Sequence, residues 1–460
     1  MNAKNLLSVG VAAALMGAVV APTHATNGYF THGVGTHSKS MAGAGDAMPR
    51  MAIDIANNPS TGVLIGDQLD VGLAVFSPRR SYETSASQLN GQFGSFSLNT
   101  PGEVESDNEW FPIPYIAKNW KLDDDSALTV AFYGRGGMNT DYTSGSASFD
   151  PDGPGPAPVM EFPGVYGGGT TGVNLNQAFF EVSYSFKAAE NVAIGIAPIF
   201  AYQLFSAEGL GSFAPYTRTF AASGGTAFPQ NLTNKGADSS MGYGLKAGVT
   251  WRPTDVVSLF AAYQTKMDME EFSEYRDLFA EQGSFDIPAN ARVGVSFVAT
   301  DNLKLHFDVE YIEYSDVASV GNAIGGVINC PTAGFGGTDI ESCLGGNSGF
   351  GFGWDDVTIY QFGAEWVPES LDGITLRAGY NYGEQPISGA DAAINILAPA
   401  TVEEHFTFGI CQELSNGDHM SLAFMYAPEK EVSGPNFFDP TQNVSFAMDQ
   451  FEIEFAYSFK

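Results

Sequence analysis

Apolar and polar residues alternate along most of the chain after residue 67. In one run, Phe180, Val182, Tyr184 and Phe186 are separated by Glu181 and two serines. A β-strand places successive side chains on opposite faces, so a period of two predicts strands with one apolar and one polar face. The pattern continues to the end of the chain and therefore predicts an all-β fold.

About fourteen such segments follow one another. An even number of amphipathic strands is typical of antiparallel barrels that span the bacterial outer membrane with both chain ends on the periplasmic side. We therefore expect residues 62–460 to form a transmembrane antiparallel β-barrel. The predicted strands begin near Gln68, Trp110, Ala127, Asn176, Val192, Asp238, Val256, Ile287, Leu303, Val357, Ile374, Glu403, His419 and Gln450.

The predicted connections alternate between short turns and long loops rich in Gly and Pro. Outer-membrane barrels have tight periplasmic turns and longer extracellular loops, which this alternation matches. The short turns are residues 187–191, 252–255, 300–302, 368–373 and 414–418, and the long loops are residues 142–173, 207–235, 317–354 and 385–401.

A soluble β-sandwich is the alternative architecture, because its strands also carry one apolar face. The composition of 13% aromatic and 16% charged residues fits a barrel in lipid better, since lipid surrounds one face and water or a ligand path meets the other. The mean hydropathy of −0.04 excludes a helical membrane protein. After the first 25 residues, no apolar run reaches the roughly 18 residues that a spanning helix needs.

Residues 1–25 have the pattern of a secretory signal peptide. A polar start with Lys4 precedes an apolar stretch over residues 6–20, and Thr23-His24-Ala25 forms a small-x-small cleavage site. The mature chain is therefore expected to be exported and to begin at Thr26.

Residues 26–61 precede the first strand and are rich in small residues. They are too few for a domain, and a closed barrel needs something to fill its lumen, so we interpret this segment as a plug, or hatch. Asn57, Asn58 and Pro59 are expected to fix its end beside the wall, and Gly43 and Gly45 to keep it flexible. A disordered leader is the alternative.

The charge balance limits the possible partners. The chain carries 52 Asp and Glu against 20 Lys and Arg, a net charge of −32, which argues against nucleic acid as a ligand. Acidic clusters such as Asp123-Asp124-Asp125 are expected to solvate loops; bridging to lipopolysaccharide through divalent cations is the alternative.

Cysteine and histidine give little sign of a metal site. Cys330 and Cys343 lie in one Gly-rich loop, close enough in sequence for a disulfide in an oxidising compartment, whereas Cys411 is expected to be a free, packed thiol. His32 and His37 of the hatch are expected to be packed or solvated. No ligand spacing points to a metal, and no cofactor is expected.

Several short motifs, in their order along the chain, resemble those of the FadL family of outer-membrane transporters for long-chain fatty acids and hydrocarbons. The resemblance covers essentially the whole mature chain. Ser60 stands where the family commonly has Ala after Asn-Pro. The motifs are Asn27-Gly28-Tyr29-Phe30, residues 38–45 (SKSMAGAG), Asn57-Asn58-Pro59, residues 132–138 (FYGRGGM), residues 287–294 (IPANARVG) and residues 376–380 (LRAGY).

The resemblance implies a fourteen-stranded barrel closed by an N-terminal hatch and acting as a passive channel for hydrophobic compounds in the Gram-negative outer membrane. It also implies a kink in the third strand that opens the wall for sideways exit into the bilayer. Gly134, Gly136 and Gly137 lie where such a kink would fall, since Gly in a strand often marks a bulge. Glycines that only approach a turn are the alternative.

Apolar residues of the outer loops are candidates for first capture of the substrate. Burial of apolar surface at about 25 cal/mol per Å² would hold a hydrophobic molecule there. Packing of the loops on each other is the alternative. The candidates are Phe205, Leu210, Phe213, Phe220, Phe228, Phe272, Tyr275, Leu278 and Phe279.

A second site is expected in the lumen, beneath the loops and against the hatch. The alternation places Lys246, Arg292 and Arg377 on the lumen side, where each is a candidate partner for a carboxylate head group. Structural ion pairs are the alternative, and an acid-rich lumen favours neutral hydrocarbons. The acidic residues expected to point inward are Glu181, Asp308, Glu310, Glu365, Glu403 and Glu413.

Three functions remain open at this stage. The first is passive uptake of long-chain fatty acids, or of aromatic or aliphatic hydrocarbons, by a monomer that contacts outer-membrane lipid and lipopolysaccharide. A general porin would need an open, charged lumen. An outer-membrane lipid hydrolase is the third, but the chain has neither G-x-S-x-G nor H-E-x-x-H, so we expect no enzyme activity.

Overall fold

The computed structural model of the protein describes residues 27–151 and 158–460. The expected signal peptide, residues 1–25, lies outside the described residues.

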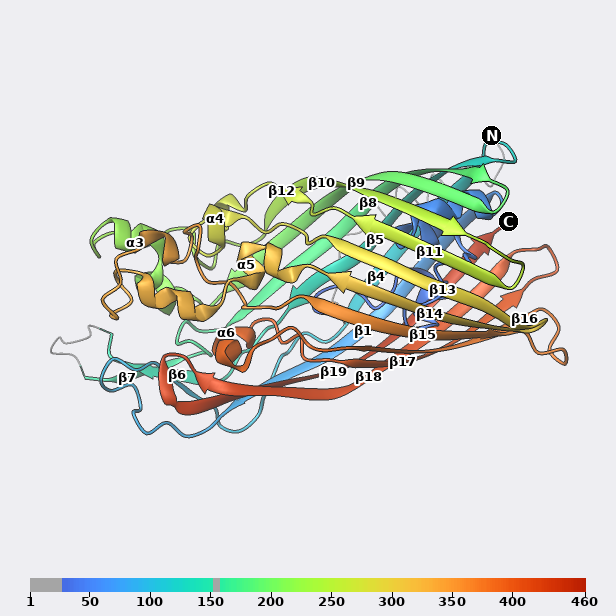
Figure 1. Cartoon of the computed structure of the whole chain (residues 1–460). Coiled ribbons are helices and arrows are strands. Elements are labelled where there is room, and N and C mark those ends of the chain that lie inside the picture. Colours follow the sequence, from blue (N-terminus) through green and yellow to red (C-terminus); the bar gives the residue numbers. More distant parts are fainter. Residues whose placement is uncertain (1–26, 152–157) are drawn as a thin grey trace.

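The wall is one antiparallel sheet that closes on itself (Figure 1). Its order runs from β11 through β19 to β1 and on to β10, and pairing of β10 with β11 completes the circle. Of its sixteen strands, β3 (Val104–Glu105) and β12 (Asp268–Met269) have two residues each, which leaves fourteen wall strands. The predicted fourteen-stranded barrel is confirmed.

The wall strands are β1 (Gln68–Thr84), β4 (Phe111–Lys121), β5 (Ser126–Asn139), β8 (Gly172–Ala189), β9 (Val192–Glu208), β10 (Asp238–Trp251), β11 (Val257–Gln264), β13 (Asn290–Thr300), β14 (Leu303–Ile312), β15 (Val357–Trp366), β16 (Ile374–Gly383), β17 (Glu404–Glu413), β18 (His419–Asn436) and β19 (Asp439–Phe459).

The apolar faces of the strands point out of the barrel. In β10, Tyr243 is 68% exposed, whereas Lys246 and Thr250 of the same strand are each 1% exposed. A sandwich would bury the apolar face instead, so the outward apolar surface identifies lipid as the surrounding medium. No helix in the described part of the chain combines the length and apolar character needed to cross a membrane.

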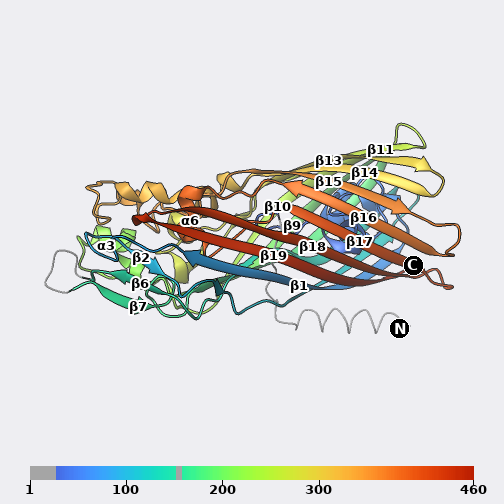
Figure 2. The same cartoon turned by 90° about the horizontal axis from the view of Figure 1, so that it is seen from below.

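The last strand begins eleven residues before its predicted start near Gln450, because β19 starts at Asp439. Here Val444, Phe446 and Met448 are buried on the inner side, whereas Phe455 farther along the strand faces outward. The apolar face therefore changes sides between the part that packs against the loops and the part in lipid. Figure 2 shows β18 and β19 as long neighbouring strands beside β1.

The long loops gather at one end of the barrel and the short turns at the other (Figure 1). Cys330 and Cys343 are joined by a disulfide in the loop between β14 and β15. The loop elements are β2 (Ser97–Asn99), β6 (Ser146–Phe149), β7 (Met160–Pro163), η3 (Gly211–Tyr216), α3 (Arg218–Ala222), η4 (Ser273–Tyr275), α4 (Ala280–Gly283), η5 (Tyr314–Asp316), α5 (Ala318–Gly321), η6 (Ile324–Asn329), η7 (Ile340–Ser342), η8 (Gly389–Asp391) and α6 (Ala392–Asn395).

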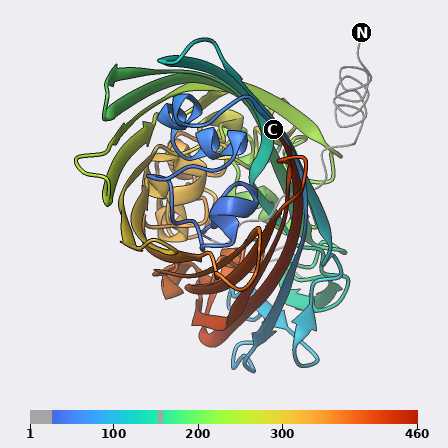
Figure 3. The same ribbon diagram turned by 90° about the vertical axis from the view of Figure 1, so that its right-hand side faces the viewer.

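Residues 27–65, called here the N-terminal segment, lie inside the barrel (Figure 3). The segment contains α2 (Gly35–Lys39), η1 (Ala52–Ala56) and η2 (Pro59–Leu64). Helix α2 contacts β17, β18 and β19, η1 contacts β1, β4 and β5, and η2 contacts β8, β9 and β10. The segment therefore touches strands around much of the wall.

Candidate functional site

The end of the N-terminal segment is fitted to the wall at Asn58. Its side-chain amide donates to Thr250 Oγ1 over 2.9 Å, and its Oδ1 accepts from the backbone N–H of Ser60, which caps η2. A Cβ atom on wall residue Gly195 would lie 2.2 Å from the carbonyl of Pro59, and one on Gly248 would lie 2.4 Å from Asn58 Oδ1. Because glycine has no side chain, these two strand residues leave room for the Asn-Pro turn.

The other expected hatch residues have structural roles inside the segment. Asn57 donates to Ser38 Oγ and to Asp46 Oδ1, each over 3.0 Å. Gly43 and Gly45 have φ values of +95° and +106°, and a Cβ on Gly43 would lie 2.2 Å from a carbonyl oxygen. These glycines satisfy a left-handed backbone in close packing, and the flexible role expected for them stays a prediction.

Buried ion pairs join the segment to the wall. Lys39 Nζ lies 2.8 Å from Glu452 and 2.9 Å from Glu454, both on β19. Farther along the segment, Asp46 lies 2.8 Å from Arg292 of β13. All of these side chains are nearly inaccessible to solvent, so each carboxylate depends on its partner for compensation.

The three lumen cations predicted to meet a substrate all have carboxylate partners. Lys246 lies 2.9 Å from Glu181 and donates to the Ala56 carbonyl, and Arg292 pairs with Glu310 as well as with the segment. Arg377 lies 3.0 Å from Glu365. None of the three lines the upper cavities described below, so the structure places them in the structural role held as the alternative.

Two of the predicted inward carboxylates lie elsewhere. Glu413 is exposed at a short turn, and Glu403 pairs with exposed Lys430 at the end of β17. The alternation failed for both because they lie at strand ends, where the chain leaves the wall.

The third wall strand, β5, has a bulge at the predicted glycines. Its register with β8 shifts between Gly134 and Gly136, so that Arg135 is the extra residue. The N-terminal segment pairs with this bulge: Thr31 N–H donates to the Arg135 carbonyl over 2.9 Å, and Gly137 N–H donates to the Tyr29 carbonyl over 3.1 Å. The backbone of the N-terminal segment thus pairs with the backbone of β5 at the bulge.

Strands β4 and β5 are not paired at the same level, and this unpaired stretch is called here the wall opening. Their pairing ends at Tyr115 and Tyr133, although β4 extends to Phe111 beside β1 and β5 extends to Asn139 beside β8. Pro112 and Pro114 lie in the part of β4 that has no partner on the β5 side. Because proline has no N–H group, this edge also offers fewer donors for a neighbouring strand.

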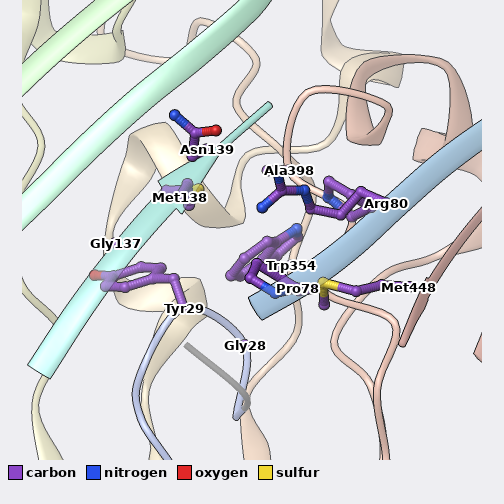
Figure 4. A pocket seen from close by; sticks show the side chains of 12 residues that line it. Gly28, Tyr29, Pro78, Arg80, Gly137, Met138, Asn139, Trp354, Ala398 and Met448 are labelled. Atoms are coloured by element: carbon purple, nitrogen blue, oxygen red, sulfur yellow. The ribbon is translucent and has the colours of Figure 1, made fainter. Parts of the chain in front are cut away.

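A small cavity lies between the loops and the N-terminal segment, beside Gly137 and Met138 of β5 (Figure 4). Its walls include Tyr29 of the segment, Met138 of β5, Trp354 of a loop and Met448 of β19. The one charged residue lining it is Arg80 of β1. The cavity thus combines aromatic and thioether walls with a single cation.

Arg80 is 4% exposed and lacks a carboxylate partner within ion-pairing distance in the described part of the chain. Its Nη2 donates to Ser106 Oγ and to the Asn108 carbonyl, but its Nε and Nη1 atoms have no hydrogen-bond partner. A buried guanidinium with unused donors is costly unless an anion meets it. Arg80 is therefore placed to receive a carboxylate.

Most of the predicted loop residues come together above this cavity. The ring of Phe205 lies 5.6 Å from Phe272, 4.9 Å from Tyr275 and 4.6 Å from Phe279. Phe205, Leu210, Leu278 and Phe279 line one apolar cavity, and Phe213 lines a second. Phe220 instead contacts Phe228, which is 63% exposed, so this pair lies on the loop surface.

One stretch of loop, residues 393–400, contributes to all three cavities. The cavities have free volumes of about 30, 10 and 30 Å³. Since one water molecule needs about 10–15 Å³ by this measure, each holds at most a few waters. A hydrophobic ligand fits only after side chains or loops move.

Sequence reasoning missed Arg80 and Trp354. Arg80 follows Arg79 in the strand, but its distance from any acidic partner depends on the loop residues packed around it, which the alternation does not predict. Nowhere in residues 27–151 and 158–460 do three or more His, Cys, Asp or Glu side chains come close enough to hold a metal.

The chain is similar to known proteins both in its sequence and in its fold. A family model described as outer membrane protein transport protein (OMPP1/FadL/TodX) matches residues 17–448. No curated protein sequence matches the chain.

Three crystal structures share the fold. The toluene transporter TodX of P. putida is 16% identical, with 93% of this chain and 98% of that chain covered and a TM-score of 0.61. A FadL homologue of Pseudomonas aeruginosa is 15% identical, with 94% and 98% covered and a TM-score of 0.61. The toluene transporter TbuX of Ralstonia pickettii is 15% identical, with 93% and 98% covered and a TM-score of 0.54.

Proposed function

The chain belongs to the OMPP1/FadL/TodX family of outer membrane transport proteins, and from that premise we propose that it takes up hydrophobic carboxylates of the long-chain fatty acid class. It is an outer-membrane transport protein and not an enzyme. The observation that carries the choice of substrate is Arg80, a buried cation with unused donors in a cavity lined mainly by apolar and aromatic residues.

Capture begins at the loops. The cavity lined by Phe205, Leu210, Leu278 and Phe279 offers an apolar surface for a hydrocarbon tail. A tail entering it displaces the few waters that fit and separates the packed rings. Burial at about 25 cal/mol per Å² then offsets the loss of ring contacts.

The carboxylate then meets Arg80. A carboxylate can accept a hydrogen bond from the Nε–H or from the Nη1 group of Arg80, and these two unused donors lie on different edges of the guanidinium. Tyr29, Met138 and Trp354 surround the carbon atoms nearest the head group. The site therefore recognises the charged head group and the apolar tail of the same molecule.

Exit follows the opening between β4 and β5. Residues 26–61 act as the hatch within a barrel of residues 62–460, and Tyr29 both lines the cavity and pairs with the bulge at Gly137. A substrate that displaces Tyr29 therefore loosens the pairing at the bulge. Sideways release into the outer-membrane lipid follows, without an open path for ions.

Neutral aromatic hydrocarbons are the second candidate. Two of the three cavities have no charged lining residue, and the structural relatives TodX and TbuX are toluene transporters. A neutral ligand would bind there and leave Arg80 unused.

Binding to the purified protein separates the two candidates. We expect Arg80→Gln to raise the Kd of a long-chain fatty acid at least tenfold and to leave the Kd of toluene unchanged. The matched control is Arg79→Gln, because Arg79 is exposed and lies 3.7 Å from Asp449. Equal fatty acid affinity in all three proteins, with toluene bound more tightly, would assign the hydrocarbon class instead.

A further inference from the structure

A larger cavity opens at the short-turn end of the barrel, below the N-terminal segment. Its free volume is about 500 Å³, which is in the range of small-molecule sites. Met48, Pro49 and Arg50 of the segment form one side, and Arg252 and Lys304 come from the wall end. This space is called here the vestibule; by the orientation of outer-membrane barrels, it faces the periplasm.

Basic residues are concentrated around the vestibule in a chain with only 20 Lys and Arg. Arg50, Lys304 and Arg377 all pair with one carboxylate, that of Glu365, at distances of 2.6, 2.8 and 3.0 Å. One negative charge compensates three positive charges there. Excess positive charge therefore remains at the floor of the vestibule.

Arg252 adds a fourth cation. It follows β10, and within the described residues its guanidinium has neither a hydrogen bond nor an ion pair; only its backbone N–H donates, to the Asn191 carbonyl. Partial burial lowers the pKa of Arg252, and the positive charge of Arg50 lowers it further. The two guanidinium groups thus repel each other across the cavity.

The acidic residues that line the vestibule do not cancel this charge. Glu190 and Asp255 are exposed on turns, and neither forms an ion pair with Arg252 or Arg50 in the described structure. The lining residues carry three cations, Arg50, Arg252 and Lys304, and two carboxylates, and buried Glu365 and Arg377 beneath them add one charge of each sign. An anion between Arg50 and Arg252 would relieve their repulsion.

We infer that the vestibule binds a small oxyanion, a carboxylate or a phosphate, between Arg50 and Arg252. Guanidinium groups pair with both classes through two parallel hydrogen bonds, which makes them the usual residues for such ligands. This site is separate from uptake at Arg80, since the N-terminal segment lies between the two cavities. It goes beyond the proposed function and does not depend on it.

The bound anion would also act on the N-terminal segment. Arg50 belongs to the segment and Arg252 to the wall, so one anion held by both links them. A ligand that binds only while the segment is in place inside the barrel stabilises that position of the segment by mass action. Occupancy from the periplasm would therefore hold the hatch in place.

Isothermal titration calorimetry of the purified full barrel at low ionic strength tests the site, with inorganic phosphate and succinate as separate probes. Succinate has no long apolar tail, so it does not report on the Arg80 cavity. The variants are Arg252→Gln and Arg50→Gln. The control is Lys187→Gln, which removes a cation at the same end that lies 3.5 Å from Asp125.

We expect saturable binding of at least one probe, with a Kd at least tenfold higher in each Arg variant and unchanged in Lys187→Gln. Binding of phosphate alone or succinate alone identifies which oxyanion the site takes. No saturable heat with either probe, or equal weakening by Lys187→Gln, would overturn the inference. Electrophoresis of heated and unheated samples checks that each variant is a folded barrel.

Discussion

Replacing Lys39 by Met removes the cation that the N-terminal segment places between two carboxylates of β19. Lys39 Nζ lies 2.8 Å from Glu452 and 2.9 Å from Glu454, and all three side chains are at most 4% exposed. Methionine keeps much of the side-chain volume but none of the charge. The variant therefore leaves two buried carboxylates close together without a cationic partner, although Glu454 still accepts a hydrogen bond from Thr36 Oγ1.

The size of the effect follows from burial. Breaking a buried ion pair by removing one partner costs about 3–5 kcal/mol, because the remaining charge is uncompensated. Each 1.4 kcal/mol is about a factor of ten, so the equilibrium constant for the segment to leave its place in the lumen rises by about 10²- to 4 × 10³-fold. When the segment leaves, water reaches the carboxylates and the penalty disappears.

Single-channel conductance in planar bilayers measures the outcome. We expect the wild-type barrel to be nearly closed to ions and Lys39→Met to show frequent openings. Hydrogen exchange of residues 27–65 should accelerate in parallel, while the wall strands keep their protection. The control variant combines Lys39→Met with Glu452→Gln and Glu454→Gln, which removes the charges that need compensation and should restore the closed barrel.

Two results would refute the reasoning. One is a Lys39→Met barrel as closed to ions as the wild type, which would mean that the ion pairs do not hold the segment. The other is a triple variant as leaky as the single variant, which would mean that volume and shape matter more than charge. A large steady current in the wild type would instead favour a general porin.

Four further predictions test other parts of the structure. Gly195→Val places a side chain where the Pro59 carbonyl lies 2.2 Å from the Cβ position. We expect about 1–3 kcal/mol of destabilisation of the N-terminal segment and a raised ion conductance. The control Gly66→Val should behave as wild type, because the space around Gly66 is open. Gly137→Leu narrows the cavity beside the wall opening, and we expect at least a tenfold loss of fatty acid uptake by cells with normal barrel content; unchanged uptake would remove the sideways exit. Cys330→Ser with Cys343→Ser opens a loop of sequence separation 13, worth about 3 kcal/mol, and should speed proteolysis of residues 313–356 without altering heat resistance of the barrel; loss of the barrel itself would contradict a local role. The pKa of Glu341 lies below its ordinary value of 4.5, first because the Asn347 backbone N–H donates to it and then because Arg218 pairs with it at 2.9 Å. The stability that Glu341 contributes is therefore present above pH 4.5 and is lost as the pH falls through the lowered pKa. Proteolysis of these loops should speed up in acid, and Glu341→Gln should abolish that pH dependence.

The wall was predictable because each strand in lipid obeys one simple rule. Outward positions must be apolar and inward positions face a polar lumen, so the period of two marks thirteen of the strand starts to within a few residues. The rule fails for β19, where the strand stands among loops and the apolar face turns inward at Val444, Phe446 and Met448. There the medium outside the barrel changes from lipid to water, and the sequence pattern inverts with it.

The site was less predictable because it depends on pairing between distant residues. Alternation correctly places Lys246, Arg292 and Arg377 inside, but it cannot show that Glu181, Glu310 and Glu365 lie beside them. Arg80 also points inward, but among the described residues it has no carboxylate within ion-pairing distance, and its guanidinium lies 5.6 Å from the centre of the Phe111 ring. That difference arises from how loops and strands meet in three dimensions, so it becomes visible only in the folded chain.

The first and last wall strands both contact the N-terminal segment, and these contacts affect the stability of the closed barrel. Strands β1 and β19, the first and last of the wall, pair from Leu69 with Phe459 to Thr84 with Val444. Three carboxylates on these strands meet partners in the N-terminal segment: Asp70 accepts from the Ala52 N–H, and Glu452 and Glu454 meet Lys39. A cylinder that closed around an empty lumen would leave all three charges without these partners, so the segment lowers the free energy of closure. The segment that lies inside the lumen therefore also favours the closed state of the wall.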